Sequence, residues 1–318
     1  MKKTAKTLIG VVCLALVGTL LFAAGVAEDE YPSKPIYTIV PWGAGGGTDI
    51  TVRGFLQVAE RYVGTTFNVT NIPGGVGSVG WAEAARANAD GYTIAALTYD
   101  LMVHSASADS PVSYKDFIPV VTIAQYPQVL AVKVDDPWTD FAEFVDFTES
   151  RPGDVRIALS GLGGIHHQAL LTIERQAGVE FRPVPFRGGA ECIAALLGGN
   201  VEATFTDVPE AADRPDLRVL VQFAAQRHVD APEVPTAREF GMDIDFSSFR
   251  SLGVPKGTPQ HVVDFLREAF DETWHSEEFL TWANNAGVAP SYMSGADTQV
   301  MFDSIFPAVQ EALKLMDQ

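Results

Sequence analysis

The sequence contains few cysteines and few basic residues, and these two shortages argue against a disulfide and against a nucleic-acid partner. Of two cysteines among 318 residues, Cys13 lies in the apolar N-terminal stretch, so removal of that stretch leaves Cys192 with no disulfide partner. The apolar helical pattern around Cys192 indicates a small core residue. Lys and Arg total 22 against 40 Asp and Glu, a net charge of −18, so no nucleic-acid partner is expected. An anion site in so acidic a chain must depend on local dipoles rather than on the overall field.

The common catalytic motifs are missing as well. The sequence contains no G-x-S-x-G elbow, no H-E-x-x-H and no G-K-[S/T] phosphate loop. His166 and His167 are adjacent, and neighbours on a helix point about 100° apart, so the two cannot chelate one metal ion. We therefore expect no enzyme, no catalytic residue and no metal site.

One long apolar run is present, at the N-terminus. Three lysines precede the uncharged residues 8–22, and Gly25-Val26-Ala27 then offers a small-x-small cleavage site. This order predicts a signal peptide over residues 1–27 and a periplasmic location. The alternative is an uncleaved anchor, because residues 7–27 carry no charge and are long enough to span a membrane.

Two segments of the chain share one plan. An apolar strand at 36–40 leads into G-A-G-G at 43–46 and then a helix, and a strand at 155–159 leads into G-L-G-G at 161–164 and then a helix. A glycine turn that delivers the chain into a helix leaves free N–H groups at a positive dipole end. Such an end binds carboxylate or phosphate, so the two turns together predict a site for a small anion.

The candidate ligand-binding residues lie in these two turns, in a third glycine turn that follows a strand at 182–186, and after the strand at 202–206. They are Trp42, Gly45, Gly46, Gly47, Thr48, Asp49, Ser160, Gly161, Gly163, Gly164, His166, Arg187, Gly188, Gly189 and Asp207.

Several of these residues have a second interpretation. Thr48 and Asp49 either cap a helix or face the ligand. Trp42 either walls the site or packs in the core, and the strand's C-terminal edge favours the wall. Arg187 either holds a carboxylate through two hydrogen bonds or pairs with a surface acid. His166 is expected to donate to a ligand carboxylate or to bound water.

A further glycine motif predicts a nucleotide cofactor if taken alone. Residues 75–80 read G-x-G-x-x-G after a strand-like run, and Asp100 follows at the distance of a ribose-binding acid. Against NAD binding, Pro73 interrupts the entry to the glycines, the motif does not follow the first strand, and the chain is expected to be exported. We expect no cofactor.

Short β-branched runs alternate with helical patterns from Tyr31 onward, which predicts an α/β protein with mostly parallel sheets and flanking helices. Strands are expected at 36–40, 66–70, 92–98, 118–124, 128–134, 155–159, 182–186, 202–206, 217–223 and 249–254. Helices are expected at 48–62, 77–88, 101–106, 138–150, 166–177, 189–198, 235–240, 259–273, 276–285 and 296–315.

Two strands that each end at a proline near a helix start, Pro137 and Pro259, mark crossings between two domains. The first domain is expected to comprise 28–124 plus 249–318, and the second, inserted domain 125–248, with the ligand cleft between them. Two short connections would form the hinge.

Several short motifs, in order along residues 31–318, resemble the Bug/TctC-type solute receptors of tripartite tricarboxylate transporters. The motifs are YPSKPI at 31–36, VP at 40–41, GGGTD at 45–49, NIPG at 71–74, DGYT at 90–93, RGGA at 187–190, LGG at 197–199, VPT at 234–236 and PKGTP at 255–259. The resemblance implies a two-domain Venus-flytrap fold (type II) and a carboxylate held by backbone amides and bridging waters in the two turns. Trp42 stands where the family usually has Phe or Tyr, and Ile165 brings no hydroxyl. Asp207 keeps an acid common in the family.

The resulting expectation is a periplasmic receptor that binds a small organic carboxylate and delivers it to two membrane subunits of such a transporter. We expect a monomer. A sensor that presents the same fold to a two-component kinase is an alternative, and a secreted enzyme is another. The ligand stays open: Arg187 suits a mono- or dicarboxylate, Trp42 an aromatic acid and Asp49 an amino acid.

Overall fold

The computed structural model describes residues 31–212 and 214–316; the predicted signal peptide lies outside them. Its strands are β1 (Ile36–Val40), β2 (Phe67–Asn71), β3 (Thr93–Leu97), β4 (Phe117–Lys133), β5 (Arg156–Leu159), β6 (Arg182–Pro185), β7 (Ala203–Asp207), β8 (Leu217–Phe223), β9 (Ser247–Pro255) and β10 (Pro290–Ser294). Its helices are α2 (Gly47–Val63), α3 (Ser78–Arg86), α4 (Tyr99–Ala106), α5 (Phe141–Glu149), α6 (Ile165–Ala177), α7 (Gly189–Leu197), α8 (Val208–Ala212), α9 (Gln260–His275), α10 (Glu277–Asn285) and α11 (Gly295–Met316), with 3₁₀ turns η1 (Tyr114–Asp116) and η2 (Ala237–Phe240).

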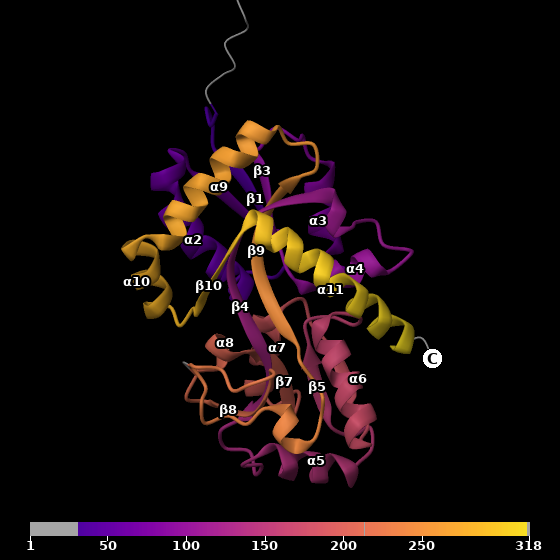
Figure 1. The fold of residues 1–318 in the computed structure, drawn as a ribbon. Coiled ribbons are helices and arrows are strands. Elements are labelled where there is room, and N and C mark those ends of the chain that lie inside the picture. The colour runs from indigo at the N-terminus through magenta and orange to yellow at the C-terminus, as the bar shows by residue number, and fades with distance from the viewer. Residues whose placement is uncertain (1–30, 213, 317–318) are drawn as a thin grey trace, which may run out of the picture.

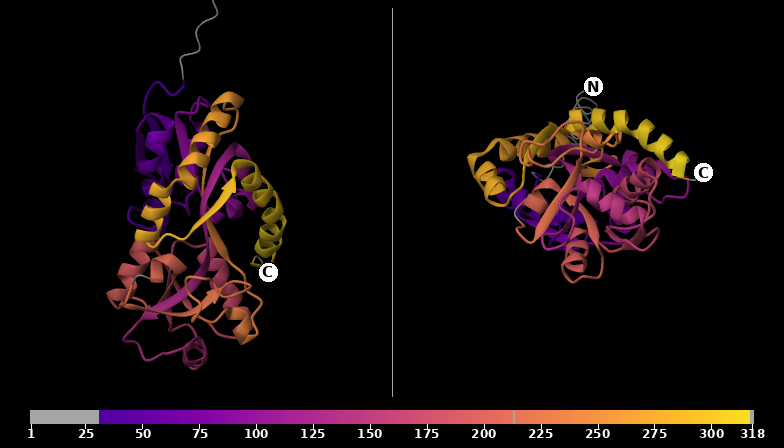
Figure 2. Two further views of the ribbon diagram at one scale, coloured as in Figure 1. Left: turned by 60° about the vertical axis from the view of Figure 1, so that its left-hand side comes forward. Right: turned by 90° about the horizontal axis from the view of Figure 1, so that it is seen from below.

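Two separate hydrophobic cores divide the molecule into two lobes (Figure 1). The first lobe is built around a core drawn from residues 36–126 and 249–309, and the second around a core drawn from residues 130–244. In the first lobe α2 packs against α9 and α10, and α11 lies along β4 and α4. The left-hand view of Figure 2 shows the lobes stacked end to end, with α11 ending near the level where they meet.

The strands β4 and β9 run through both lobes and connect them (Figure 1). They pair antiparallel from Phe117↔Pro255 to Pro127↔Ser247, after which β4 continues alongside β7 and β8. The domain boundaries predicted at 124/125 and 248/249 therefore fall inside continuous strands. The inserted second domain and its limits stay a prediction.

The sheets are mixed rather than mostly parallel. The strand order is β2-β1-β3-β9-β4-β7-β5-β6, and β8 and β10 also pair with β4. Only the outer strands of each lobe pair in parallel, β1 with β2 and β3, and β5 with β6 and β7. Every pairing of β4 and β9 is antiparallel, because the chain passes from lobe to lobe in opposite directions along these strands.

Most of the expected elements form, but the helix expected at 235–240 is the 3₁₀ turn η2, and neither α8 nor η1 was expected. The strands expected at 118–124 and 128–134 are one strand, because Pro127 lies where β4 changes partners rather than where it ends. The short strand β10 was not expected; it begins at a proline and pairs with β4 alone, as an edge position permits.

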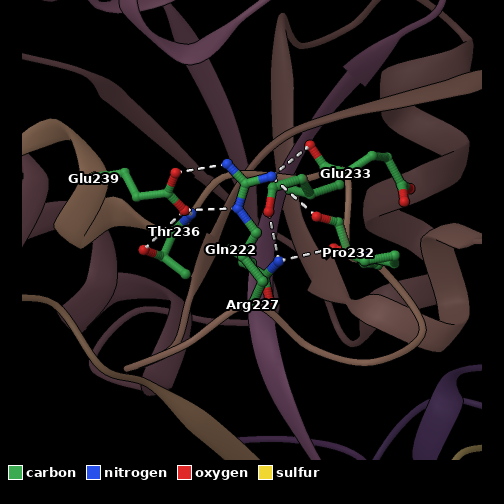
Figure 3. Close-up of polar contacts among 8 residues, drawn as sticks. Gln222, Arg227, Pro232, Glu233, Thr236 and Glu239 are labelled. Carbon is green, nitrogen blue, oxygen red and sulfur yellow. Dashed lines mark hydrogen bonds and ion pairs between the residues drawn. The ribbon is translucent and has the colours of Figure 1, made fainter.

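A polar cluster holds the loop that leads from β8 toward β9 (Figure 3). Gln222 Nε2 donates to the carbonyls of Ala231 and Val234 at 3.0 and 2.7 Å. The guanidinium of Arg227 binds both carboxylate oxygens of Glu239, at 2.8 and 2.5 Å. These contacts fix the path by which the chain returns to the second connecting strand.

Candidate ligand-binding site

A small cavity lies between the lobes, where the glycine turns face the connecting strands. Its volume is about 50 Å³, and one water molecule needs roughly 10–15 Å³ measured in this way. It therefore has room for a group the size of a few water molecules. Its walls are formed by Trp42, Gly43, Gly46, Gly47, Thr48, Thr98, Asp100, Gln128, Ser160, Ile165, His166, Gly189, Thr206, Asp207, Glu210, Ser248 and Arg250.

The first glycine turn lines the cavity with backbone. Helix α2 begins after Gly46, which has no side chain to cap the helix, so the first N–H groups depend on other partners. Glu210, from α8 in the second lobe, lies close to this turn, since a Cβ at Gly47 would be 3.7 Å from its Oε2. Thr48 is buried and borders the cavity.

Trp42 forms one wall of the cavity and is also part of the first core. Its side chain is buried, its Nε1–H donates to Thr98 Oγ1 at 3.3 Å, and its ring packs edge-on against Trp81 with centroids 6.3 Å apart. Trp42 therefore both walls the cavity and packs in the core.

The second glycine turn faces a carboxylate of the protein itself. Asp100, at the start of α4 in the first lobe, accepts a hydrogen bond across the cleft from Ile165 N–H at 2.8 Å. A Cβ at Gly164 would lie 2.5 Å from the same Asp100 oxygen and 2.8 Å from Val76 Cγ1. The N-terminus of α6 is thus occupied by Asp100, whose pKa is raised by burial.

The third glycine turn contributes a contact between lobes rather than a cation. Arg187 Nη2 pairs with Glu191 at 2.8 Å, its side chain is 73% exposed, and it does not border the cavity. Gly188 faces the first turn so closely that a Cβ there would lie 3.3 Å from Gly43 N. Gly189 borders the cavity and lies beside Glu210.

His166 is fixed by hydrogen bonds at both ring nitrogens. Ser160 N–H donates to Nδ1 at 3.2 Å, so the proton of the neutral ring sits on Nε2, which donates to Gln128 Oε1 at 2.7 Å. Burial, followed by the charge of Arg250, lowers the pKa of His166 to about 3. The ring is neutral near pH 7, and its donor serves Gln128 rather than a ligand.

The connecting strands contribute a buried ion pair. Arg250 on β9 is 5% exposed and donates to Asp207 through Nη2 and to Ser248 through Nη1. Gln128 on β4 donates to the other oxygen of Asp207. The network reaches from the first connecting strand, through the end of β7, to the second.

Some of the predicted residues border the cavity and others support it from outside. Those that border it are Trp42, Gly46, Gly47, Thr48, Ser160, His166, Gly189 and Asp207, and those that do not are Gly45, Asp49, Gly161, Gly163, Gly164, Arg187 and Gly188. Asp49 accepts from Gly45 N–H at 2.9 Å and from Arg53 Nε at 2.8 Å, so it holds the first turn in shape. Which residues contact a ligand stays a prediction.

Residues that sequence reasoning missed supply most of the cavity's charge. Arg250, Glu210 and Gln128 border the cavity, and so does Asp100, which the sequence suggested only as a ribose-binding acid. Arg250 could have been noticed in the sequence, because it is the single charge in an otherwise uncharged strand and a buried arginine is nearly always paired. Nothing in the local sequence marks the acids as part of this cavity, because they come together only when distant segments of the chain meet.

The G-x-G-x-x-G loop is part of the contact between lobes. It follows β2, which is the edge strand, whereas a dinucleotide fingerprint follows the first strand of its sheet at the centre. His104 Nε2 lies 2.9 Å from the carbonyl of Gly75, and Val76 packs against the second turn at Gly161. The glycines themselves are explained within the first lobe: Gly75 and Gly77 have positive φ, and Gly80 packs too closely against Ile72 and Pro41 for a side chain.

In the part of the chain that the structure describes, no three His, Cys, Asp or Glu side chains are grouped so as to hold a metal ion. Cys192 is buried as expected, and burial raises the pKa of its thiol to about 12. Among the described helices, none has the length and apolar character needed to cross a membrane.

Comparison with known proteins decides the family. The sequence pattern described as "Tripartite tricarboxylate transporter family receptor" matches residues 52–306. The chain belongs to this TctC family. The family is one of solute-binding receptors, a non-enzymatic component of a transporter, so the expectation of a receptor rather than an enzyme follows from membership.

Relatives of this TctC-family chain support the same fold. Protein BugT of Bordetella pertussis is 28% identical over 296 residues, which cover 87% of this chain and 89% of BugT. A solved structure described as a periplasmic transporter is 30% identical, with a TM-score of 0.84 and coverage of 89% and 97% of the two chains. A Rhodopseudomonas palustris protein solved with adipate is 25% identical, with a TM-score of 0.83 and coverage of 90% and 98%. The chain therefore has the α/β periplasmic binding protein fold.

Proposed function

We propose that this chain is an exported receptor that encloses a small organic carboxylate between its lobes and delivers it to two membrane subunits of a tripartite transporter. The observation that carries the proposal is the cavity itself. It combines backbone N–H groups of a glycine turn with the buried Arg250, at the contact between two lobes joined by two strands. A dipole end and a guanidinium are both suited to a carboxylate.

Several further points support this proposal. Adipate is bound by a relative of the same fold at 25% identity. Solved relatives are described as periplasmic, which agrees with a cleaved signal peptide over residues 1–27. The lobes, taken as 28–124 plus 249–318 and as 125–248, would open and close about β4 and β9. Closure is favoured when the ligand makes contacts that exist only in the closed state.

A thermal-shift screen of residues 28–318 against mono-, di- and tricarboxylates and amino acids tests this function. A ligand that binds only the folded chain stabilises it by about 2.7 kcal/mol at a hundredfold excess over its dissociation constant. We expect one carboxylate class to raise the melting temperature. If no carboxylate does so, even after the protein is unfolded and refolded to remove any co-purified ligand, the proposal is wrong.

A further inference from the structure

The cavity has more acidic than basic side chains. Its acids are Asp100, Asp207 and Glu210, and Arg250 is the one arginine or lysine that borders it within the described residues. His166 adds no positive charge near pH 7, because burial lowers its pKa to about 3. Burial raises the pKa of Asp100 and of Glu210, and the neighbouring Asp207 raises that of Glu210 further, so the site disfavours additional negative charge and favours a cationic group.

In the described part of the chain, Glu210 has neither a cationic partner nor a helix N-terminus hydrogen-bonded to its carboxylate. Asp207 is paired with Arg250, and Asp100 is held by the N-terminus of α6. Glu210 accepts from Thr206 Oγ1 at 2.7 Å, and within residues 31–212 and 214–316 it forms no ion pair.

A second observation at the same cavity points to a ligand oxygen. Arg250 is 5% exposed and borders the cavity, yet its Nε–H has no hydrogen-bond partner among the described residues. An unsatisfied donor on a buried guanidinium is costly, and a carboxylate oxygen placed there would satisfy it. Within the described chain the cavity thus offers one free hydrogen-bond donor, Arg250 Nε, and one carboxylate without a cationic partner, Glu210.

We propose that the ligand carries a protonated amine as well as a carboxylate, with Glu210 holding the amine and Arg250 Nε the carboxylate. This inference rests on the proposed function and narrows its ligand class to amino-substituted carboxylates. An ammonium group beside Glu210 gains a charge-assisted hydrogen bond. An unsubstituted carboxylate leaves Glu210 unpaired and repels it.

Isothermal titration with matched ligand pairs tests the proposal. The pairs are succinate with aspartate, glutarate with glutamate, and butyrate with 4-aminobutyrate, each added to residues 28–318 near pH 7. We expect the amino-substituted member of at least one pair to bind about tenfold or more tightly than its partner. In Glu210→Gln that preference should fall to about twofold or less, because the amide cannot pair with the ammonium.

The control variant is Glu191→Gln, which removes the same charge from an exposed carboxylate that pairs with Arg187 outside the cavity. It should keep the preference of the unaltered chain. Tighter binding of an unsubstituted member across all pairs, or a preference unchanged in Glu210→Gln, would overturn the inference while the receptor function stood. Absence of binding by every carboxylate would overturn both. If Glu210→Gln does not fold, the ratio measured on the unaltered chain decides alone.

Discussion

The first and second glycine turns have the same sequence plan, and the structure uses them differently. The first turn places Gly43, Gly46 and Gly47 on the cavity, with their backbone toward the space. The second turn places none of its glycines there, and the helix end behind it is occupied by Asp100. A helix N-terminus binds whichever anion the fold brings to it, and here the protein supplies its own.

A substitution at Gly46 tests most directly whether the first turn, unlike the second, lines the ligand cavity. Its φ of −82° suits any residue, but a Cβ there would lie 3.7 Å from Ala190 N of the other lobe, so Gly46→Leu would fill the cavity. We expect about a hundredfold loss of ligand affinity by titration, about 2.7 kcal/mol.

The matched variant is Gly163→Leu in the second turn. Gly163 has a φ of +89°, and a Cβ there would meet no atom within 4 Å, so the change costs stability but not cavity space. We expect a loss of about 1–2 kcal/mol of unfolding free energy and less than about a fivefold change in affinity. Equal losses of affinity in both variants would mean that the two turns contribute alike.

His166, which follows the second turn, is expected to make the free energy of unfolding depend on pH. The pKa of His166 is about 3 in the folded chain and near 6.5 when exposed. Between these values the unfolded chain binds a proton that the folded chain does not, so stability is full above pH 6.5 and falls as the pH decreases. Relative to His166→Gln, the unaltered chain should lose about 2 kcal/mol of unfolding free energy between about pH 7 and 5 in urea titrations. A constant difference between the two proteins across that range would contradict a neutral, buried His166.

Adding one methyl group at Gly164 tests how closely the second turn must approach Asp100. In Gly164→Ala the Cβ would lie 2.5 Å from Asp100 Oδ1, which reaches the second turn from the other lobe. We expect about a tenfold loss of affinity with no change in melting temperature without ligand. The added change Asp100→Ala should recover part of the loss, and a double variant as weak as the single one would exclude Asp100 as the cause.

The smallest effect is expected at the third turn. Arg187 is exposed and pairs with Glu191, and exposed pairs of this kind contribute roughly 0–1 kcal/mol. Arg187→Gln should change ligand affinity by less than about twofold in the same titrations. A large loss would show that Arg187 turns into the cleft when ligand binds.

Local patterns in the sequence were enough to place nearly every helix and strand and both glycine turns. Helical periodicity and β-branched runs are properties of neighbouring residues, so β1, α2, β5 and α6 could be expected within a residue or two. The strands expected at 118–124 and 128–134 form the single strand β4, and only the change of partner strands explains why it continues through Pro127.

The sequence by itself determined the family motifs, the glycine turns and the acidic character of the chain. Only the tertiary structure decided where the charges meet, because Asp100 reaches Ile165 across 65 residues of chain and Arg250 reaches Asp207 across 43. Such contacts leave no local periodicity. The folding of two lobes around β4 and β9 brings these groups into one small volume, and there a buried carboxylate must find a donor or a cation.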